Sequence, residues 1–300
     1  MRSDPALPLD APAWRGPAFQ GLREQVLRAG GIDIGLYKDR CVLRRLGARL
    51  RAAGVPDLAA YCRHLDGDPG ELHRLVEALT VNVSAFFRNP ATFRALAREV
   101  FPLLVTEKRA EGRRAIRLWS AGCATGEEPY SLAIALSEYL GPALPEFSVM
   151  ALATDVDTAS LAVARAGRYP ARSLARLPRS IVARHFERTR EGYRIGKSIR
   201  HMVHFREHNL LDPFPFTRID VAVFRNVLIY MARPLQSQLL ETFFEVLNPG
   251  GFLVLGKVEG LAGPARDRFQ VVNLAERIYR RPPPARLGPA RHTSREARGR

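Results

Sequence analysis

Short apolar segments that alternate with helical stretches constrain the fold of this chain more than any other feature. The apolar segments cover residues 115–122, 147–155, 219–226 and 250–256, and the first three are each followed by a stretch with helical periodicity. Strands that alternate with helices typically form a parallel sheet covered by helices on both faces. The second half of the chain is therefore predicted to be an α/β domain.

The first part of the chain shows helical periodicity and no strand signal. Leu36, Leu43, Leu46 and Leu50 lie on one helical face, and Gly54 ends this helix. The Pro/Arg/Gly-rich end of the chain is typical of disorder. The predicted parts are a flexible leader (1–16), a helical domain (17–80), a linker with a connecting helix (81–114), the α/β domain (115–281) and a disordered basic tail (282–300).

Residues 185–206 interrupt the alternation of strands and helices. Gly192 and Gly196 are turn candidates, and apolar residues recur around them at even spacing. Even spacing predicts a small antiparallel β insertion within the larger domain. Residues 269–273 and 276–281 are predicted to pair as a terminal hairpin.

The net charge of +16 in 300 residues is concentrated in three segments, which are residues 36–55, 160–208 and 281–300. A basic chain favours nucleic acid, an anionic membrane surface or an acidic protein as a partner. Since the charge is local, its position is more informative than its sum.

Several classes of protein are disfavoured by what the sequence lacks. There is no run of about 18 apolar residues, as a membrane-spanning helix needs, and the first residues have no apolar signal-peptide core. The cysteines Cys41, Cys62 and Cys123 are far apart and form no CxxC pair. We therefore expect a cytoplasmic protein without disulfides and without a metal ion.

The segment LWSAGCATGEEPYSLA (118–133) places a glycine-containing turn between a buried strand and a helix. Such a turn lets a ligand approach the backbone closely. Glu127 and Glu128 disfavour a phosphate at the helix N-terminus, and they suit a ligand with cationic groups. The alternative is an ordinary strand–turn–helix corner with acidic residues on its surface.

Asp155 follows the second apolar segment, at the predicted carboxyl end of a strand. A carboxylate in this place can accept hydrogen bonds from both hydroxyls of a ribose. Asp157 lies close by, and either acid can instead cap the following helix.

Two further segments place polar residues at connections. In TVNVSAFFRNP (80–90), Asn82, Ser84 and Arg88 are candidates for a ligand site, although helix capping, packing of the phenylalanines and a surface arginine explain the segment equally well. In FRNVLIYM (224–231), Arg225 and Asn226 follow a predicted strand, where open α/β sheets bind ligands. Tyr230 lies one helical turn beyond, or is a core aromatic.

Five ordered segments resemble the CheR-type chemoreceptor glutamate methyltransferases. They read LTVNVSAFFR, WSAGCATGEEPYS, ATDVD, HNLL and FRNVLIYM, and the resemblance covers roughly residues 18–280. It implies a small all-α domain followed by a class I (Rossmann-like) methyltransferase sheet. The implied cofactor is S-adenosyl-L-methionine, with S-adenosyl-L-homocysteine as product and no metal.

The implied reaction is O-methylation of glutamate side chains on chemoreceptors, which gives methyl esters for sensory adaptation. The implied partner is the cytoplasmic helical domain of these membrane receptors. In some members of the family, the small β-subdomain that corresponds to residues 185–206 docks a receptor tail. We expect a monomer that is peripheral to receptor arrays.

The resemblance also assigns site residues. Glu128 is expected near the methionine or ribose part of the cofactor, Asp155 at the ribose, and Arg88 and Tyr230 at the site of methyl transfer. The basic helix with Arg45 and Arg49 suits the acidic helices of a receptor. The full set of implied cofactor contacts is Asn82, Ser84, Arg88, Glu128, Asp155, Asn209, Leu210, Arg225 and Asn226.

The chemistry agrees with these residues, because a glutamate with a pKa of about 4.3 is already ionised at pH 7 and needs no general base. The task that remains is alignment of the carboxylate with the methyl group. The chain departs from the family pattern at Ser84, where relatives have Thr, at Phe224, where they have Cys, and at GKVEG (256–260), where a GHSE-like segment is usual.

Two other functions fit parts of the sequence. A nucleic-acid methyltransferase shares the fold and would suit the net charge, but the strand end reads FRNV where a [D/N]PP[Y/F] loop is usual, and DPFP (212–215) precedes the strand. We therefore expect no nucleic-acid partner. The second of these functions is that of a non-catalytic adaptor that binds S-adenosylmethionine.

Overall fold

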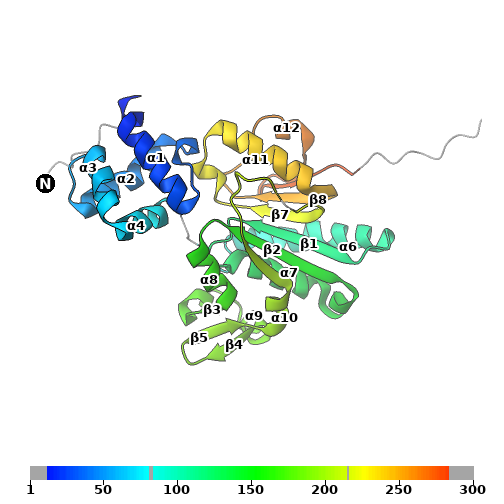
Figure 1. Ribbon diagram of the computed structural model, residues 1–300. Coiled ribbons are helices and arrows are strands. Elements are labelled where there is room, and N and C mark those ends of the chain that lie inside the picture. The colour runs from blue at the N-terminus through cyan, green and yellow to red at the C-terminus, as the bar shows by residue number, and fades with distance from the viewer. Residues whose placement is uncertain (1–11, 81–83, 215, 284–300) are drawn as a thin grey trace, which may run out of the picture.

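The structure is a computed structural model that describes residues 12–80, 84–214 and 216–283. Residues 1–11 of the predicted leader, residues 284–300 of the predicted tail and Asn82 lie outside the described residues. A helical N-terminal domain lies beside a larger α/β domain, from which a small sheet projects (Figure 1). No described helix is long and apolar enough to cross a membrane.

The N-terminal domain consists of α1 (Pro17–Gly30), α2 (Asp39–Ala53), α3 (Leu58–Gly67) and α4 (Pro69–Leu79). Aspartates begin two of these helices, since Asp57 accepts a hydrogen bond from Ala60 N at 2.7 Å and Asp68 accepts one from Glu71 N at 3.0 Å. Such caps satisfy amide groups that have no partner within the helix. The helices enclose an apolar core of their own, with Phe19, Leu22, Val26, Leu46, Tyr61 and Leu75 among its buried members.

The α/β domain has a seven-stranded sheet with the order β6-β2-β1-β7-β8-β10-β9. Its first five strands are parallel, and β10 is antiparallel to both of its neighbours. The predicted parallel sheet and terminal hairpin are therefore confirmed. The strands are β1 (Ala115–Ala121), β2 (Ser148–Asp155), β6 (Val203–Glu207), β7 (Ile219–Phe224), β8 (Leu247–Leu255), β9 (Gln270–Asn273) and β10 (Ile278–Arg280).

Each face of the sheet packs against its own set of helices. Alternate residues of β7 divide between two cores, with Val221 and Val223 in one and Ala222 and Phe224 in the other, as the two-residue period of a strand requires. The first core includes helices α5 (Pro90–Ala95), α6 (Phe101–Ala110) and α7 (Glu127–Leu140), with a π-helical turn (Leu96–Val100) between α5 and α6. The second core includes α11 (Arg233–Val246). The remaining helices are α8 (Thr158–Ala166), α9 (Arg179–His185), α10 (Lys197–Met202) and α12 (Ala265–Arg268).

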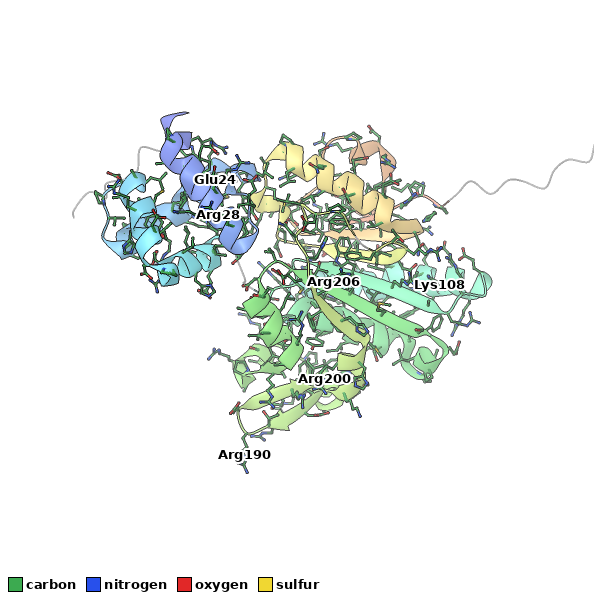
Figure 2. The ribbon with its side chains drawn as sticks, in the orientation of Figure 1. Glu24, Arg28, Lys108, Arg190, Arg200 and Arg206 are labelled. Carbon is green, nitrogen blue, oxygen red and sulfur yellow. The ribbon has the colours of Figure 1, made fainter. Side chains whose placement is uncertain are left out.

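The small antiparallel sheet has the order β3-β5-β4, with β3 (Arg168–Tyr169), β4 (Phe186–Thr189) and β5 (Gly192–Ile195). The predicted extent of 185–206 is wrong at both ends. The sheet begins at Arg168, whereas Ile199 lies in α10 and β6 belongs to the large sheet, beside β2. Arg190 projects from the tip of the small sheet and Arg200 lies on α10 (Figure 2), so the basic segment spreads over several surfaces.

Backbone hydrogen bonds fasten the N-terminal domain to the α/β domain. Lys38 N donates to Tyr230 O and Ala232 N donates to Leu36 O, both at 2.8 Å, around a bridge between Tyr37 and Met231. The Lys38 ammonium group also donates to Ile229 O at 2.8 Å. The helical domain therefore lies against the loop that follows β7, beside the carboxyl ends of the parallel strands.

Candidate active site

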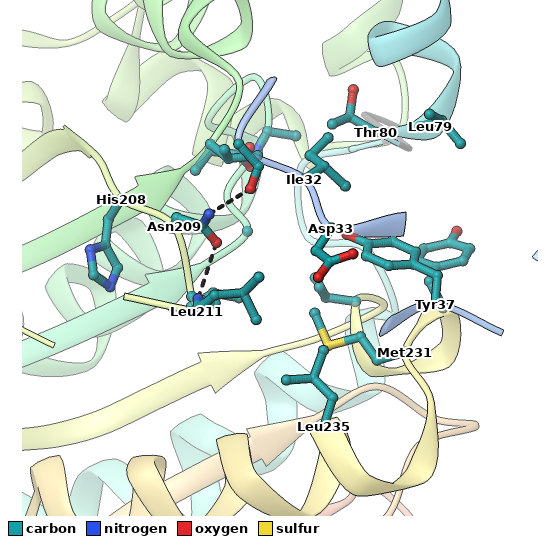
Figure 3. Close-up of a pocket in the computed structure, with 18 of the residues that line it drawn as sticks. Ile32, Asp33, Tyr37, Leu79, Thr80, His208, Asn209, Leu211, Met231 and Leu235 are labelled. Carbon is teal, nitrogen blue, oxygen red and sulfur yellow. Dashed lines mark hydrogen bonds between the residues drawn. The ribbon is translucent and has the colours of Figure 1, made fainter. Parts of the chain in front are cut away.

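A cleft with two adjoining cavities lies at the carboxyl ends of β1, β2, β6 and β7. The first, here the Asp155 cavity, lies between the strand ends and the N-terminal domain (Figure 3). The second, here the Glu128 cavity, lies between the β1–α7 turn and the segment around Arg88. Residues that line both cavities are Gly122, Ala124, Asn226, Val227 and Tyr230.

Asp155 supplies the acidic group of the first cavity. Its Oδ2 accepts a hydrogen bond from Ala124 N at 2.7 Å, and its Oδ1 accepts one from Asp157 N at 3.0 Å. Each oxygen therefore retains a lone pair for a ligand hydroxyl. Burial raises the pKa of Asp155 above its usual range, although the backbone hydrogen bonds oppose this shift. Asp157 caps α8 through Ala159 N at 2.9 Å.

The turn after β1 fits closely under the loop after β7. Gly122 has a φ of 72°, and a Cβ atom there would lie 2.7 Å from Val227 Cγ2. Only glycine allows this backbone and this approach without strain. The close contact helps to form a shared wall of the two cavities.

The N-terminal domain forms the opposite wall of the Asp155 cavity, with Asp33 and Tyr37 close to the space (Figure 3). Bonds of 2.5 and 2.6 Å from Arg23 to the two Asp33 carboxylate oxygens hold that side chain in place. Asn209 Nδ2 donates to Gly31 O at 2.6 Å, and Asn209 Oδ1 accepts from Leu211 N at 3.1 Å. Asn209 therefore joins the two domains at the cavity wall.

An ion pair dominates the Glu128 cavity. Glu128 accepts hydrogen bonds from Ser120 Oγ at 2.8 Å and from Arg225 Nη1 at 3.1 Å. Arg225 is only 5% exposed, and its Nη2 also donates to Arg88 O at 2.7 Å and Asn89 Oδ1 at 2.8 Å. One guanidinium group thus holds α7, the end of β7 and the 88–89 turn together.

Backbone strain is concentrated around the cleft. Of the six described non-glycine residues with positive φ, four lie along the cleft or beside it: Phe87, Asn89, Ala124 and Asn226. Such conformations cost of order 1–3 kcal/mol each and persist where the surroundings hold them. Because strained backbone of this kind often clusters at binding sites, the cleft is a candidate functional site.

Tyr230 and Arg88 occupy different positions at the Glu128 cavity. Tyr230 ends a one-turn helix (Leu228–Tyr230) and lines both cavities. Arg88 lines the Glu128 cavity with an exposed side chain, and Ser84 lies near it. The residues predicted for the site that meet around the two cavities are Ser84, Arg88, Glu128, Asp155, Asn209, Leu210, Arg225, Asn226 and Tyr230.

Arg45 and Arg49, which the sequence predicts as substrate-binding residues, both have partners within the chain. Arg45 is 9% exposed, donates to Leu79 O at 2.5 Å, and lies 4.5 Å from the ring centroid of Tyr230. Arg49 is paired with the buried Glu71. The Arg49 side chain is 21% exposed, so Arg45 is the more deeply buried of the two.

Glu259 is a functional candidate that the sequence did not reveal. It is 5% exposed and accepts hydrogen bonds from Gly256 N at 2.7 Å, Asn226 N at 2.9 Å and Ile229 N at 3.2 Å. Burial raises its pKa, while these amide donors oppose the shift. Glu259 therefore fixes the loop that carries Asn226 and Tyr230, and the GKVEG segment has a clear structural role.

The residues of the cleft fit S-adenosylmethionine, which joins a ribose diol to a sulfonium and an amino acid. Asp155 offers acceptors for a diol, and Glu128 offers a carboxylate near a cationic group. Arg225 Nε is buried without a hydrogen-bond partner and lines the same cavity, so it suits the carboxylate of an amino acid. No group of His, Cys, Asp or Glu that could hold a metal ion occurs within residues 12–80, 84–214 and 216–283.

The mostly parallel seven-stranded sheet, with an acid at the end of its second strand, is the fold of a class I methyltransferase that uses S-adenosylmethionine. Comparison with protein-family models is more specific. Residues 82–278 match the SAM-binding domain of CheR methyltransferase, and residues 17–80 match the all-alpha domain of the same family. The chain therefore belongs to the CheR methyltransferase family and is an S-adenosylmethionine-dependent enzyme.

Relatives of this chain are named as methyltransferases, and several of them as chemotaxis protein methyltransferases. The chain is 39% identical to chemotaxis protein methyltransferase 2 of Pseudomonas aeruginosa over 250 residues, which cover 80% of this chain and 85% of the relative. It is 33% identical to the chemotaxis protein methyltransferase of Listeria monocytogenes, over 83% of this chain and 92% of the relative. The probable biofilm formation methyltransferase WspC of P. aeruginosa is 35% identical over 76% of this chain and 54% of the relative.

Proposed function

We propose that this protein transfers the methyl group of S-adenosylmethionine to glutamate side chains in the cytoplasmic helical domain of chemoreceptors. One observation carries the proposal: the Asp155 cavity and the Glu128 cavity adjoin and share lining residues, and the exposed Arg88 lines the latter. A nucleoside held at Asp155 would direct its amino acid part toward Glu128 and Arg225. A glutamate that approaches past Arg88 would then meet the reactive methyl group.

In this assignment the chain's residues bind and align the reactants. Asp155 accepts the ribose hydroxyls, while Asn209 and Leu210 border the adenine. Glu128 and Arg225 hold the amino acid part, and Ser84 lines the same cavity. Asn226 lies between the two cavities, and its backbone N–H donates a hydrogen bond to Glu259 Oε2 that fixes this loop. No residue is required as a general base, since the substrate glutamate is ionised at neutral pH.

S-adenosylmethionine, when bound, would supply the methyl group of its sulfonium: the glutamate oxygen would bond to this carbon while the S–C bond breaks and its electron pair stays on sulfur. Arg88 orients the incoming carboxylate by charge-assisted hydrogen bonds. Tyr230, which lines both cavities, positions the reactants through its hydroxyl group. Alignment and exclusion of water then provide most of the acceleration.

The steering role first given to Arg45 and Arg49 passes to other arginines of α2. Arg40, Arg44 and Arg51 are exposed on this helix. Exposed charges of one sign speed the encounter with an acidic receptor helix more than they tighten the complex. The outer strand β4 of the small sheet is the surface we assign to receptor-tail docking, since an edge strand can add a further strand. We also propose that the enzyme acts as a cytoplasmic monomer at the periphery of receptor arrays.

The decisive test is transfer of a labelled methyl group from S-adenosylmethionine to the purified cytoplasmic fragment of a chemoreceptor. We expect the label to be released by mild base, as a carboxyl ester requires. A fragment whose methylated glutamates are replaced by alanine is the matched control. Label in DNA or RNA, or tight binding of S-adenosylhomocysteine with no transfer to any receptor, would contradict the proposal.

A further inference from the structure

A second concave surface, here the Phe87 groove, begins where the Glu128 cavity ends. Ala85 and Arg88 line both. The groove lies between α5, the outer end of α7 and the segment that leads into α9. Its apolar lining includes Phe87, Phe93, Ala97, Tyr139, Leu177 and Ile181.

The rim of the groove is basic. Arg88, Arg94 and Arg176 line it, and all three side chains are exposed. Glu138 is the acidic residue among those that line the groove, and it is paired with Arg184 and with His185, whose Nε2 lies 2.6 Å from its Oε1. The groove therefore has an apolar floor and three exposed arginines along its edge.

The apolar floor and the basic rim together indicate which kind of molecule binds in the Phe87 groove. An apolar floor suits one face of an amphipathic helix, which carries anchors at positions i, i+3, i+4 and i+7. A basic rim suits a helix with acidic side chains beside those anchors. The chain's own residues 284–300 carry five arginines and one glutamate, and a second copy carries a net charge of +16, so both would meet the rim with like charge.

We propose that the Phe87 groove binds the substrate helix itself, with the helix's apolar face on the groove floor and its acidic side chains at Arg94 and Arg176. This inference rests on the proposed function and adds to it the surface that holds the substrate. Since Arg88 borders both spaces, a helix in the groove presents an adjacent glutamate to the Glu128 cavity.

The charge part of the proposal is tested with the double variant Arg94→Glu/Arg176→Glu. The matched control is Arg98→Glu/Arg172→Glu, which makes the same change of charge at exposed arginines four residues away that do not line the groove. With a soluble receptor fragment, we expect KM of the groove variant to rise about tenfold. The value of kcat and the affinity for S-adenosylhomocysteine should stay unchanged, and the control should stay within about twofold of wild type.

The floor is tested with Ile181→Ala, for which Val163→Ala on α8 is the control, because Val163 is a 45% exposed valine outside the groove. We expect KM to rise only for Ile181→Ala. Added salt should raise the KM of the wild type more than that of the arginine double variant, because exposed charges are screened.

The outcomes separate the two proposals. A wild-type enzyme that transfers no label to the receptor fragment contradicts the proposed function and the groove's occupant together. Transfer by the wild type with equal KM values for the groove and control variants overturns the groove alone. An effect that appears with membrane-embedded receptor but not with the soluble fragment assigns the groove to the lipid surface, and a change in sedimentation assigns it to a second copy; either result overturns the proposal.

Discussion

The two cavities of the cleft are built in different ways. The Asp155 cavity is shared between two domains, and its wall depends on contacts such as Asn209 to Gly31. The Glu128 cavity belongs to the α/β domain and the segment that enters it, and the buried Arg225 holds its parts in place. In the proposed function the first cavity binds the nucleoside and the second holds the reacting groups, so the two cavities should respond differently to substitution.

The largest effect is expected from Arg225→Met. Removal of the guanidinium leaves Glu128 partly buried without its cation and frees the 88–89 turn. Breaking one partner of a buried pair typically costs about 3–5 kcal/mol. Chemical denaturation should show a loss of this size, and methyl transfer should be abolished. Arg233→Met, at an exposed residue that begins α11, is the control; equal stability of the two variants would mean that the frame does not depend on Arg225.

The second effect concerns ligand binding alone. Asp155→Asn removes the charge that, in the proposed function, accepts the ribose hydroxyls, and we expect calorimetry to show about 100-fold weaker binding of S-adenosylhomocysteine. Asp157→Asn is a matched control, because asparagine also caps helices well. If the affinity of Asp155→Asn for S-adenosylhomocysteine is unchanged, the ribose does not bind at Asp155.

A third experiment separates the two cavities by kinetics. Tyr230→Phe keeps the ring beside Arg45 but loses the hydroxyl. We expect kcat to fall about tenfold, which corresponds to the loss of one hydrogen bond, while the affinity for the cofactor changes little. Tyr37→Phe, in the Asp155 cavity only, should leave kcat at saturating cofactor unchanged. If both variants show the same pattern, the distinction between a binding cavity and a reaction cavity fails.

The sequence predicted the sheet and most of the cleft for the same physical reason. Parallel strands bring their carboxyl ends to one edge, so polar residues such as Asp155, Arg225 and Asn226 could be placed together from their positions after apolar segments. The error in the small sheet has a local cause. Even spacing of apolar residues continues through Ile199 into Val203 and Phe205, although a helix and a strand of the large sheet intervene.

Residues whose role depends on distant partners could not be predicted. The helical periodicity predicts that Arg45 lies on the surface of its helix. Only the packing of the two domains against each other places it beside Tyr230. Glu259 lies in a glycine-containing loop with no local signal, and its function appears only when three amide groups from two segments converge on its carboxylate.

The smallest effect is a pH dependence that belongs to the Asp155 cavity. Since burial raises the pKa of Asp155, its protonation begins at a higher pH than for an ordinary aspartate, and a protonated carboxyl cannot accept both ribose hydroxyls. The Kd for S-adenosylhomocysteine should therefore rise as the pH falls through this pKa, approaching about tenfold per pH unit for one proton.

The stability of the free protein should change in the opposite direction, because a folded-state pKa of Asp155 above the unfolded value adds stability as the pH falls. Calorimetry across pH, with Asp155→Asn as the variant that lacks the titrating group, measures the first trend. A dependence of equal steepness in Asp155→Asn would assign the titration to another group, and the binding cavity would lose its distinguishing electrostatic feature.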